Sequence, residues 1–259
     1  MNYGLYTAYL GMRARMRTID VIANNIANSS TSGFKAGGMV YHSVETDAAG
    51  ILPAWAQPYG QPAADAQAGT PLTPSRALGV VTGGLTDFST GSIRQTGNPL
   101  DVALSGDGFL VVQTARGERY TRSGSLTLDA TGQLVTMQGD LVVGDGGPIT
   151  IRPGEVSIGE DGSVSVGGQI AGRLKLVRFE NPQAELVKEG DSLFAAISTD
   201  PPAESTQTRV LQGALESSNV NPVEQMVSMM QNNREFESLQ RSVTQLMTLR
   251  KIASEIGKI

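Results

Sequence analysis

Residues 5–26 read LYTAYLGMRARMRTIDVIANNI. Apolar side chains recur in this stretch at alternating steps of four and three residues, which is the spacing of a heptad seam on an α-helix. The members of the seam are Leu5, Tyr9, Met12, Met16, Ile19, Ala23 and Ile26. The polar run 29–33 ends in glycine, a typical helix stop. The sequence therefore predicts an N-terminal helical segment within residues 1–35.

This seam has two interpretations. Either it packs on the chain's own domain, or it forms a coiled coil with helices of other chains. Asn24, Asn25 and Asn28 lie beside the seam. They either fix the register of a coiled coil by hydrogen bonding, as buried asparagine does, or only cap and end the helix.

A second helix is predicted within residues 214–259. Asn221 is suited to the cap, Pro222 to the first helical position, and Glu224 follows three residues after the cap. No proline or glycine occurs between residues 223 and 256, which predicts a helix of roughly 35 residues, about 50 Å long. Its apolar stripe includes Phe236, Leu239, Val243, Leu246, Leu249 and Ile256. Each helix buries little alone, so the two stripes are expected to pack on each other or on other chains.

Residues 36–78 are predicted to be an extended linker rich in proline, alanine and glycine. Five of the 12 prolines lie between residues 47 and 75, and proline resists both helix and interior strand. Trp55 is the chain's only tryptophan and lies in this segment. It either docks on a neighbouring subunit or packs on the chain's own domain.

Residues 79–213 are predicted to form an all-β domain, a sandwich or a barrel-like fold. Short β-prone segments alternate with glycine-rich turns throughout this region. The segments named by this pattern begin at Phe109, Ser125, Leu134, Leu141, Ile149, Val156, Ser163 and Leu174. The fold class is therefore mainly β, with an all-β central domain inserted between long N- and C-terminal helices.

The composition removes several classes of function. The chain has no cysteine and one histidine, His42, which rules out a thiolate nucleophile, a disulfide and a cysteine zinc site. The 20 basic against 25 acidic side chains argue against nucleic-acid binding. The Asp-Gly clusters lack the ligand register of a calcium loop and are expected to be hairpin turns. We expect no catalytic residue, cofactor, metal or small-molecule substrate.

No stretch has the 18 or more apolar residues of a membrane span. The N-terminus also lacks the pattern of a cleavable secretory signal, because basic residues occupy 13–17 where an apolar region belongs.

Four ordered segments are similar to the signatures of flagellar rod and hook proteins. They are residues 21–36, with Ile-Ala-Asn-Asn-Ile-Ala-Asn and Thr-Ser-Gly-Phe-Lys; residues 96–109; residues 120–136; and residues 215–221. The signature residues at the predicted turns and ends are Gly97, Asn98, Pro99, Asp101, Asn219 and Asn221. Gly97, Asn98 and Pro99 are expected to set a sharp turn into the β domain.

Within that family, residues 172–177 and 234–237 are more similar to proximal-rod members, whereas residues 20–25 are closer to the distal-rod pattern. The proximal-rod type is favoured. A distal-rod or hook-type axial protein is the alternative, followed by a soluble β-domain binding module, which would not need the two helical stripes.

The resemblance implies a structural subunit of the flagellar basal-body rod. Such subunits assemble helically with copies of themselves and other rod proteins and transmit torque from motor to hook. Their terminal helices form a coiled-coil layer that lines an export channel, and the β domain between the helices faces outward. The resemblance also implies a periplasm-spanning location, contact with the flagellar type III export apparatus, and export by that apparatus without a cleaved signal peptide.

Overall fold

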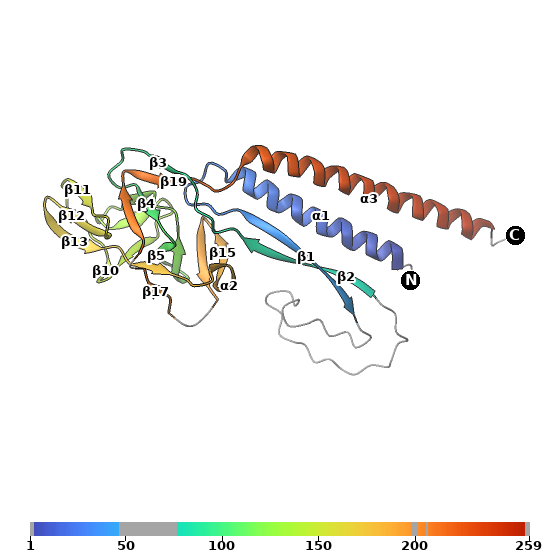
Figure 1. The fold of residues 1–259 in the computed structure, drawn as a ribbon, viewed down its shortest axis with the longest axis horizontal. Coiled ribbons are helices and arrows are strands. Elements are labelled where there is room, and N and C mark those ends of the chain that lie inside the picture. The colour runs from blue at the N-terminus through green and yellow to red at the C-terminus, as the bar shows by residue number, and fades with distance from the viewer. Residues whose placement is uncertain (1–2, 47–76, 198–200, 206, 257–259) are drawn as a thin grey trace, which may run out of the picture. The chain divides into compact units, whose positions relative to one another are not determined.

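The computed structural model describes residues 3–46, 77–197, 201–205 and 207–256 (Figure 1). The chain divides into two compact units. Unit 1 consists of Met1–Asn24, Gly37–Leu85 and Val223–Ile259, and unit 2 of Asn25–Ala36 and Thr86–Pro222. The expected fold class, mainly β with a long helix near each end, is confirmed.

Two long helices run side by side and antiparallel in unit 1 (Figure 1). Helix α1 spans Tyr3–Ala27 and helix α3 spans Pro222–Ile256, which is 35 residues. At the end of α1, both the backbone N–H and the hydroxyl of Ser29 donate to the carbonyl of Ile26, at 3.2 and 2.8 Å. The predicted end of α1 and the predicted start of α3 at Pro222 are therefore confirmed. No helix in the described part of the chain is both long and apolar enough to cross a membrane.

A two-stranded sheet completes unit 1. Strand β1 (Gly37–Thr46) pairs with strand β2 (Ala77–Thr86). Residues 37–46 are thus a paired strand inside the segment that we expected to be a linker. Their Met-Val-Tyr-His-Ser-Val run favours a strand, a signal masked by the proline-rich composition that follows. Trp55, whose docking was expected, lies outside the described residues.

Unit 2 is built on a sheet of ten antiparallel strands, ordered β15-β16-β6-β5-β9-β8-β7, with β14 beside β5, β17 beside β14 and β10 beside β9. The bounds are β5 (Gly108–Thr114), β6 (Gly117–Thr121), β7 (Leu126–Leu128), β8 (Leu134–Thr136), β9 (Leu141–Gly144), β10 (Gly147–Pro148), β14 (Leu176–Arg178), β15 (Leu186–Gly190), β16 (Leu193–Ala196) and β17 (Ala203–Glu204). A single helical turn, α2 (Pro182–Glu185), precedes β15.

Three smaller sheets complete unit 2. Strands β11 (Val156–Ile158), β12 (Ser163–Val166) and β13 (Gln169–Arg173) form one of them. The other two each join an early strand to a late one. Strand β4 (Val102–Ser105) pairs with β18 (Arg209–Gln212), and β3 (Ile93–Gln95) pairs with β19 (Ala214–Glu216). The end of unit 2 in the sequence therefore folds back onto its beginning.

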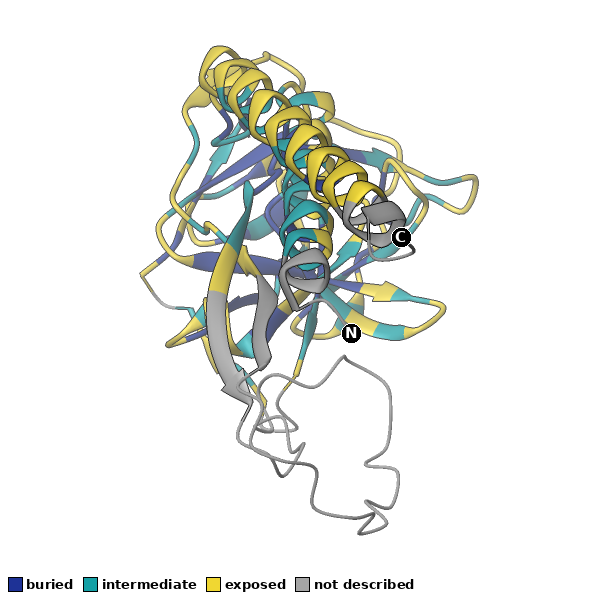
Figure 2. Cartoon of the chain, turned by 90° about the vertical axis from the view of Figure 1, so that its right-hand side faces the viewer, coloured by how far each residue is buried: buried dark blue, intermediate teal, exposed yellow. Residues whose placement is uncertain are grey.

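The core of unit 2 has an aliphatic and an aromatic part. Valine, leucine and isoleucine side chains from both early and late strands, among them Leu104, Val112 and Val210, form the larger cluster. Phe109, Tyr120, Phe179 and Phe194 dominate the second. Each such side chain removed from water contributes about 1.5–3 kcal/mol. Figure 2 shows the buried residues gathered in the strands, while α3 is mostly exposed.

The strand prediction holds only in part at residues 149–151. This segment belongs to none of the named strands, but Thr150 forms an isolated antiparallel bridge with Gln133, and Ile149 and Ile151 are buried. Its backbone bonds to residues 132–134. The N–H of Leu134 donates to the carbonyl of Ile149 at 2.9 Å, and the N–H of Ile151 donates to the carbonyl of Gly132 at 2.7 Å. Apolar alternation here accompanies burial and a single bridge, not a full ladder. The pattern did not name strands β1 to β4, β6, β10, β13 and β15 to β19.

Candidate functional site

The predicted seam on α1 is largely uncovered within the chain. Tyr9 and Met16 are 53% and 54% exposed, and Ala23 is exposed as well. Met12, Ile19 and Ile26 are half-buried, and the side chain of Leu5 is not described. The residues of α1 that are buried are Ala14, Ile22 and Asn25, which face a different direction. The face that one chain covers is therefore not the heptad seam.

The predicted stripe on α3 is divided in the same way. Val243 is buried and Phe236 and Leu239 are half-buried, whereas Leu246 and Leu249 are exposed. The side chain of Ile256 is not described. Sequence reasoning left a second exposed group out of the interface, although its spacing of three, one and three residues marks one helix face. The group is Val223, Met226, Val227 and Met230.

Arg15 joins the elements of unit 1. Its guanidinium lies 2.7 Å from a carboxylate oxygen of Glu235 and donates to Asn232 at 3.1 Å, both on α3. It also lies 5.8 Å from the ring centroid of Tyr41 on β1, and the hydroxyls of Tyr41 and Thr18 are in contact. Because Arg15 and Glu235 are both partly exposed, their ion pair is worth about 1 kcal/mol or less.

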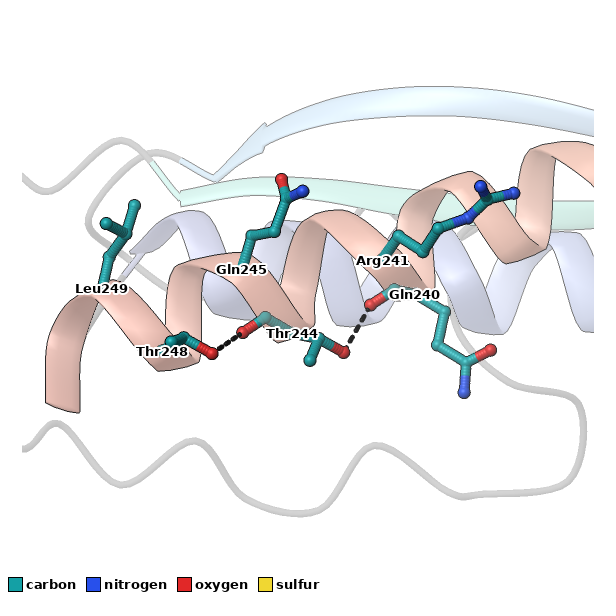
Figure 3. Close-up of a pocket in the computed structure, with 6 residues that line it drawn as sticks. All are labelled: Gln240, Arg241, Thr244, Gln245, Thr248 and Leu249. Carbon is teal, nitrogen blue, oxygen red and sulfur yellow. Dashed lines mark hydrogen bonds between the residues drawn. The ribbon is translucent and has the colours of Figure 1, made fainter.

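A hollow of about 580 Å³ lies along α3 (Figure 3). The described residues that line it all come from this helix: Gln240, Arg241, Thr244, Gln245, Thr248 and Leu249. The hydroxyls of Thr244 and Thr248 donate to the carbonyls four residues earlier, at 2.9 and 3.0 Å. These six described side chains supply neither a nucleophile with a base nor a set of metal ligands.

The residues of the central signature build a turn. The carboxylate of Asp101 accepts from the Thr96 hydroxyl at 2.7 Å and from the Asn98 amide at 3.0 Å. The backbone N–H of Asp101 closes the turn on the carbonyl of Asn98 at 3.0 Å. Gly97 has φ +75° and donates to Gly213, and the carbonyl of Pro99 accepts from Gln212 at 2.8 Å. These residues set the entry to β4.

Asn219 ties together three segments that are distant in the sequence. Its side-chain oxygen accepts from the N–H of Ala36 at 2.7 Å. Its amide nitrogen donates to the carbonyl of Asp87 at 2.9 Å and to the hydroxyl of Ser89 at 3.0 Å. Asn221 directly precedes α3, and Asn28 directly follows α1, where its side chain accepts from Thr31 at 3.2 Å. Asn25 is buried, and Asn24 is exposed.

A buried cluster of charges lies next to Asn219 in the fold. The ammonium of Lys35 is 2.6 Å from one carboxylate oxygen of Glu216, and the guanidinium of Arg122 is 3.5 Å from the other. All three side chains are at most 3% exposed. Burial lowers the pKa of Lys35 and of Arg122, and Glu216 opposes that shift in both. Sequence reasoning missed this cluster, because its members are isolated charges in three separate signatures.

Two carboxylates of the Asp-Gly clusters, those of Asp129 and Asp161, bond within their own turns. Asp129 accepts from the backbone N–H groups of Gln133 and Thr131, each at 2.8 Å, and these bonds lower its pKa. The hydroxyl and backbone N–H of Ser163 lower the pKa of Asp161 in the same way. In the ranges that the structure describes, no group of three or more acidic or histidine side chains is placed to hold a metal.

Comparison with protein families matches three parts of the chain. Residues 5–35 match "Flagella basal body rod protein", residues 103–166 match "Flagellar hook protein FlgE/F/G D1 domain", and residues 211–256 match "Flagellar basal body rod FlgEFG protein C-terminal". The flagellar basal-body rod protein FlgF of Caulobacter vibrioides is 36% identical over 263 residues, covering 100% of both chains.

The chain belongs to the flagellar rod and hook protein family. Further members of the family are similar over most of their length. FlgF of Salmonella typhimurium is 35% identical, covering 94% of each chain, and the rod protein FlgG of Bacillus subtilis is 32% identical, covering 94% of this chain and 95% of its own. The resemblance read from the signatures is thereby confirmed. As a member of this family, the chain is a structural protein and not an enzyme.

Proposed function

We propose that this chain is a proximal-rod type subunit of the flagellar basal body, which assembles helically with its own copies and with other rod proteins. In this assembly α1 and α3 form a coiled-coil layer that lines an export channel, and the β domain faces outward. The subunit transmits torque from the motor towards the hook. Full-length similarity to proteins named FlgF supports this assignment.

The exposure of the heptad seam is the observation that carries the proposal. Tyr9 and Met16 on α1, and Met226, Met230 and Leu249 on α3, are each about half or more exposed in the single chain. Covering one such side chain contributes about 1.5–3 kcal/mol. Neighbouring subunits that cover both helices would gain this energy repeatedly along a polymer.

The remaining expectations belong to the same proposal. We assign residues 1–35 and 214–259 to the helical layer, 36–78 to an extended connection and 79–213 to the β domain. Asn24, Asn25 and Asn28 either fix the register of the helices in the assembled rod or cap and end α1, and the bond from Thr31 to Asn28 supports the second role. The subunit contacts the type III export apparatus, leaves the cytoplasm through it without a cleaved signal peptide, and resides in the rod across the periplasm. The absence of cysteine suits an oxidising compartment, since no stray disulfide forms.

Met16→Asp tests the proposal in cells that depend on this protein for motility. Met16 is exposed in the single chain, so the variant should fold with an unchanged melting curve. In the rod its carboxylate would be buried without a partner, at a cost of several kcal/mol per copy. We expect accumulated protein, no hooks and no swimming, and the same from Ile19→Asp. Arg13→Gln, at an exposed position of α1 outside the seam, is the control. Normal swimming with Met16→Asp would show that the seam is not an assembly interface.

A distal-rod position is the second candidate. Residues 20–25 are closer to that pattern, and relatives named FlgG are 31–32% identical to this chain. Imaging a tagged copy along purified basal bodies separates the two positions, because the label would lie near the membrane motor or near the hook.

A further inference from the structure

The buried charges of Lys35, Arg122 and Glu216 lie where three segments of unit 2 meet. We call residues 33–36, 89–92 and 216–219 the junction. Backbone bonds join these segments directly: the N–H of Gly33 donates to the carbonyl of Glu216, and the N–H of Ser217 to that of Ser92, both at 2.8 Å. The first segment follows α1, and the third precedes α3. The junction therefore ties together the stretches that lead out of one helix and into the other.

Glu216 is the acceptor on which the junction depends. One of its oxygens accepts from Lys35 at 2.6 Å and from the N–H of Gly91 at 2.9 Å. Its other oxygen faces Arg122 at 3.5 Å. Lys35 also donates to the carbonyl of Ser89 at 2.7 Å. The Nε of Arg122 is buried and has no hydrogen-bond acceptor. Two buried cations thus share one carboxylate.

Removing that carboxylate would leave two like charges buried near one another. The guanidinium of Arg122 itself disfavours the charged form of Lys35, and burial of both groups acts in the same direction. A buried charge that loses its partner is strongly destabilising. Asp87 and Asp107 also favour the charged forms of Lys35 and Arg122 respectively, but Glu216 is the carboxylate that contacts both cations, so their arrangement depends strongly on it.

We propose that Lys35, Arg122 and Glu216 form a latch that closes unit 2 last. Glu216 is the final residue of β19, which pairs with β3, just as β18 pairs with β4. Lys35 precedes Glu216 by 181 residues. In a chain that emerges from its N-terminus, the segment after α1 bonds to residues 87–89 early, but Lys35 and Arg122 lack the carboxylate of Glu216 until β18 and β19 arrive. The latch then fixes, in one step, the stretch that follows α1 and the stretch that precedes α3. This inference does not depend on the proposed function.

Hydrogen exchange on the folded full-length chain tests the latch. In Glu216→Gln, the amides of Gly33, Gly91 and Ser217 should exchange at least about 100-fold faster, because a buried ion pair has lost one partner. The amides of β5 and β6 should keep their rates. The control is Glu189→Gln, which removes a carboxylate paired with Arg119 at 2.7 Å nearer the surface and should leave the junction unchanged.

Pulse-labelled refolding tests the order. The junction amides should become protected after those of β5 and β6, and together with those of β18. Lys35→Met serves as a second variant, since it leaves Glu216 paired with Arg122, and should also release the junction selectively. The proposal is overturned by early protection of the junction, by equal acceleration over all of unit 2, or by failure of both variants to fold while Glu189→Gln folds. In that last case the cluster holds the whole unit.

Discussion

Arg15 on α1 and Glu235 on α3 form an ion pair, with Nη2 and Oε2 2.7 Å apart. This pair, together with the bond from Arg15 to Asn232, connects the two long helices inside one chain. The apolar side chains Met16 and Leu249 remain exposed on the same helices. The two helices thus meet through these polar contacts and through Leu239, which lies against Gly11 of α1, and they leave other apolar side chains exposed.

Arg15→Met should weaken the contact between α1 and α3 without unfolding the chain. The pair is partly exposed, so its loss should cost less than about 1 kcal/mol and speed amide exchange in α1 by about fivefold at most. Hydrogen exchange of the isolated chain measures this. Arg241→Met is the matched control, because Arg241 pairs with Glu237 on its own helix at 3.6 Å. Equal effects of the two variants on α1 would contradict a specific role for Arg15.

Gly33→Ala should destabilise unit 2 severely. Gly33 has φ +67°, and a Cβ there would lie 2.3 Å from the backbone N of Ser123 and 2.4 Å from the carbonyl carbon of Arg122. Backbone must move to relieve such contacts, so we expect a loss of about 3 kcal/mol or more in urea unfolding.

Gly139→Ala is the control for Gly33→Ala. Gly139 has φ +93°, but no atom lies within 4 Å of a Cβ built there. Only the backbone strain remains, which costs about 1–2 kcal/mol. If both variants lost the same stability, close packing around Gly33 would not be the cause.

Lys188→Met should change how stability depends on pH. Burial lowers the pKa of Lys188 to about 8; its ammonium donates to the carbonyl of Lys35 and lies 4.5 Å from the ring centroid of Phe34. Unfolded lysine keeps its proton up to a pKa of about 10.4. Between these values the unfolded chain binds more protons, so this residue makes stability rise with pH from about 8 to 10.4.

Urea unfolding at a series of pH values measures this contribution. Below pH 8 the variant should equal or exceed the natural chain, because it lacks the buried charge. As pH rises towards 10, the natural chain should gain relative to Lys188→Met. Lys175→Met, at a more exposed position beside Glu118, is the control. The prediction would be contradicted if the stability of the natural chain relative to Lys188→Met stayed constant, or fell, as the pH rises from 8 towards 10.

Local patterns found the two long helices and seven of the 19 strands that the structure describes. The ends of α3 follow from Pro222 and from the absence of proline and glycine after it, both of which act on neighbouring residues. The same patterns failed at β1, where an adjacent proline-rich stretch dominated the composition, and at residues 149–151 the expected strand is reduced to one bridge between Thr150 and Gln133. Heptad spacing also predicted an apolar seam, but not which part of it a single chain covers.

The sequence by itself determined the two amphipathic helices, the β character of the segment between them, and the family, because periodicity, turn residues and signatures are properties of short stretches. Only the tertiary structure decided that Lys35 meets Glu216 and that Arg15 meets Glu235. Those meetings depend on the register of β19 on β3 and on the rotation of α1 against α3. Both are set by packing among residues about 200 apart in the chain, which no local spacing encodes.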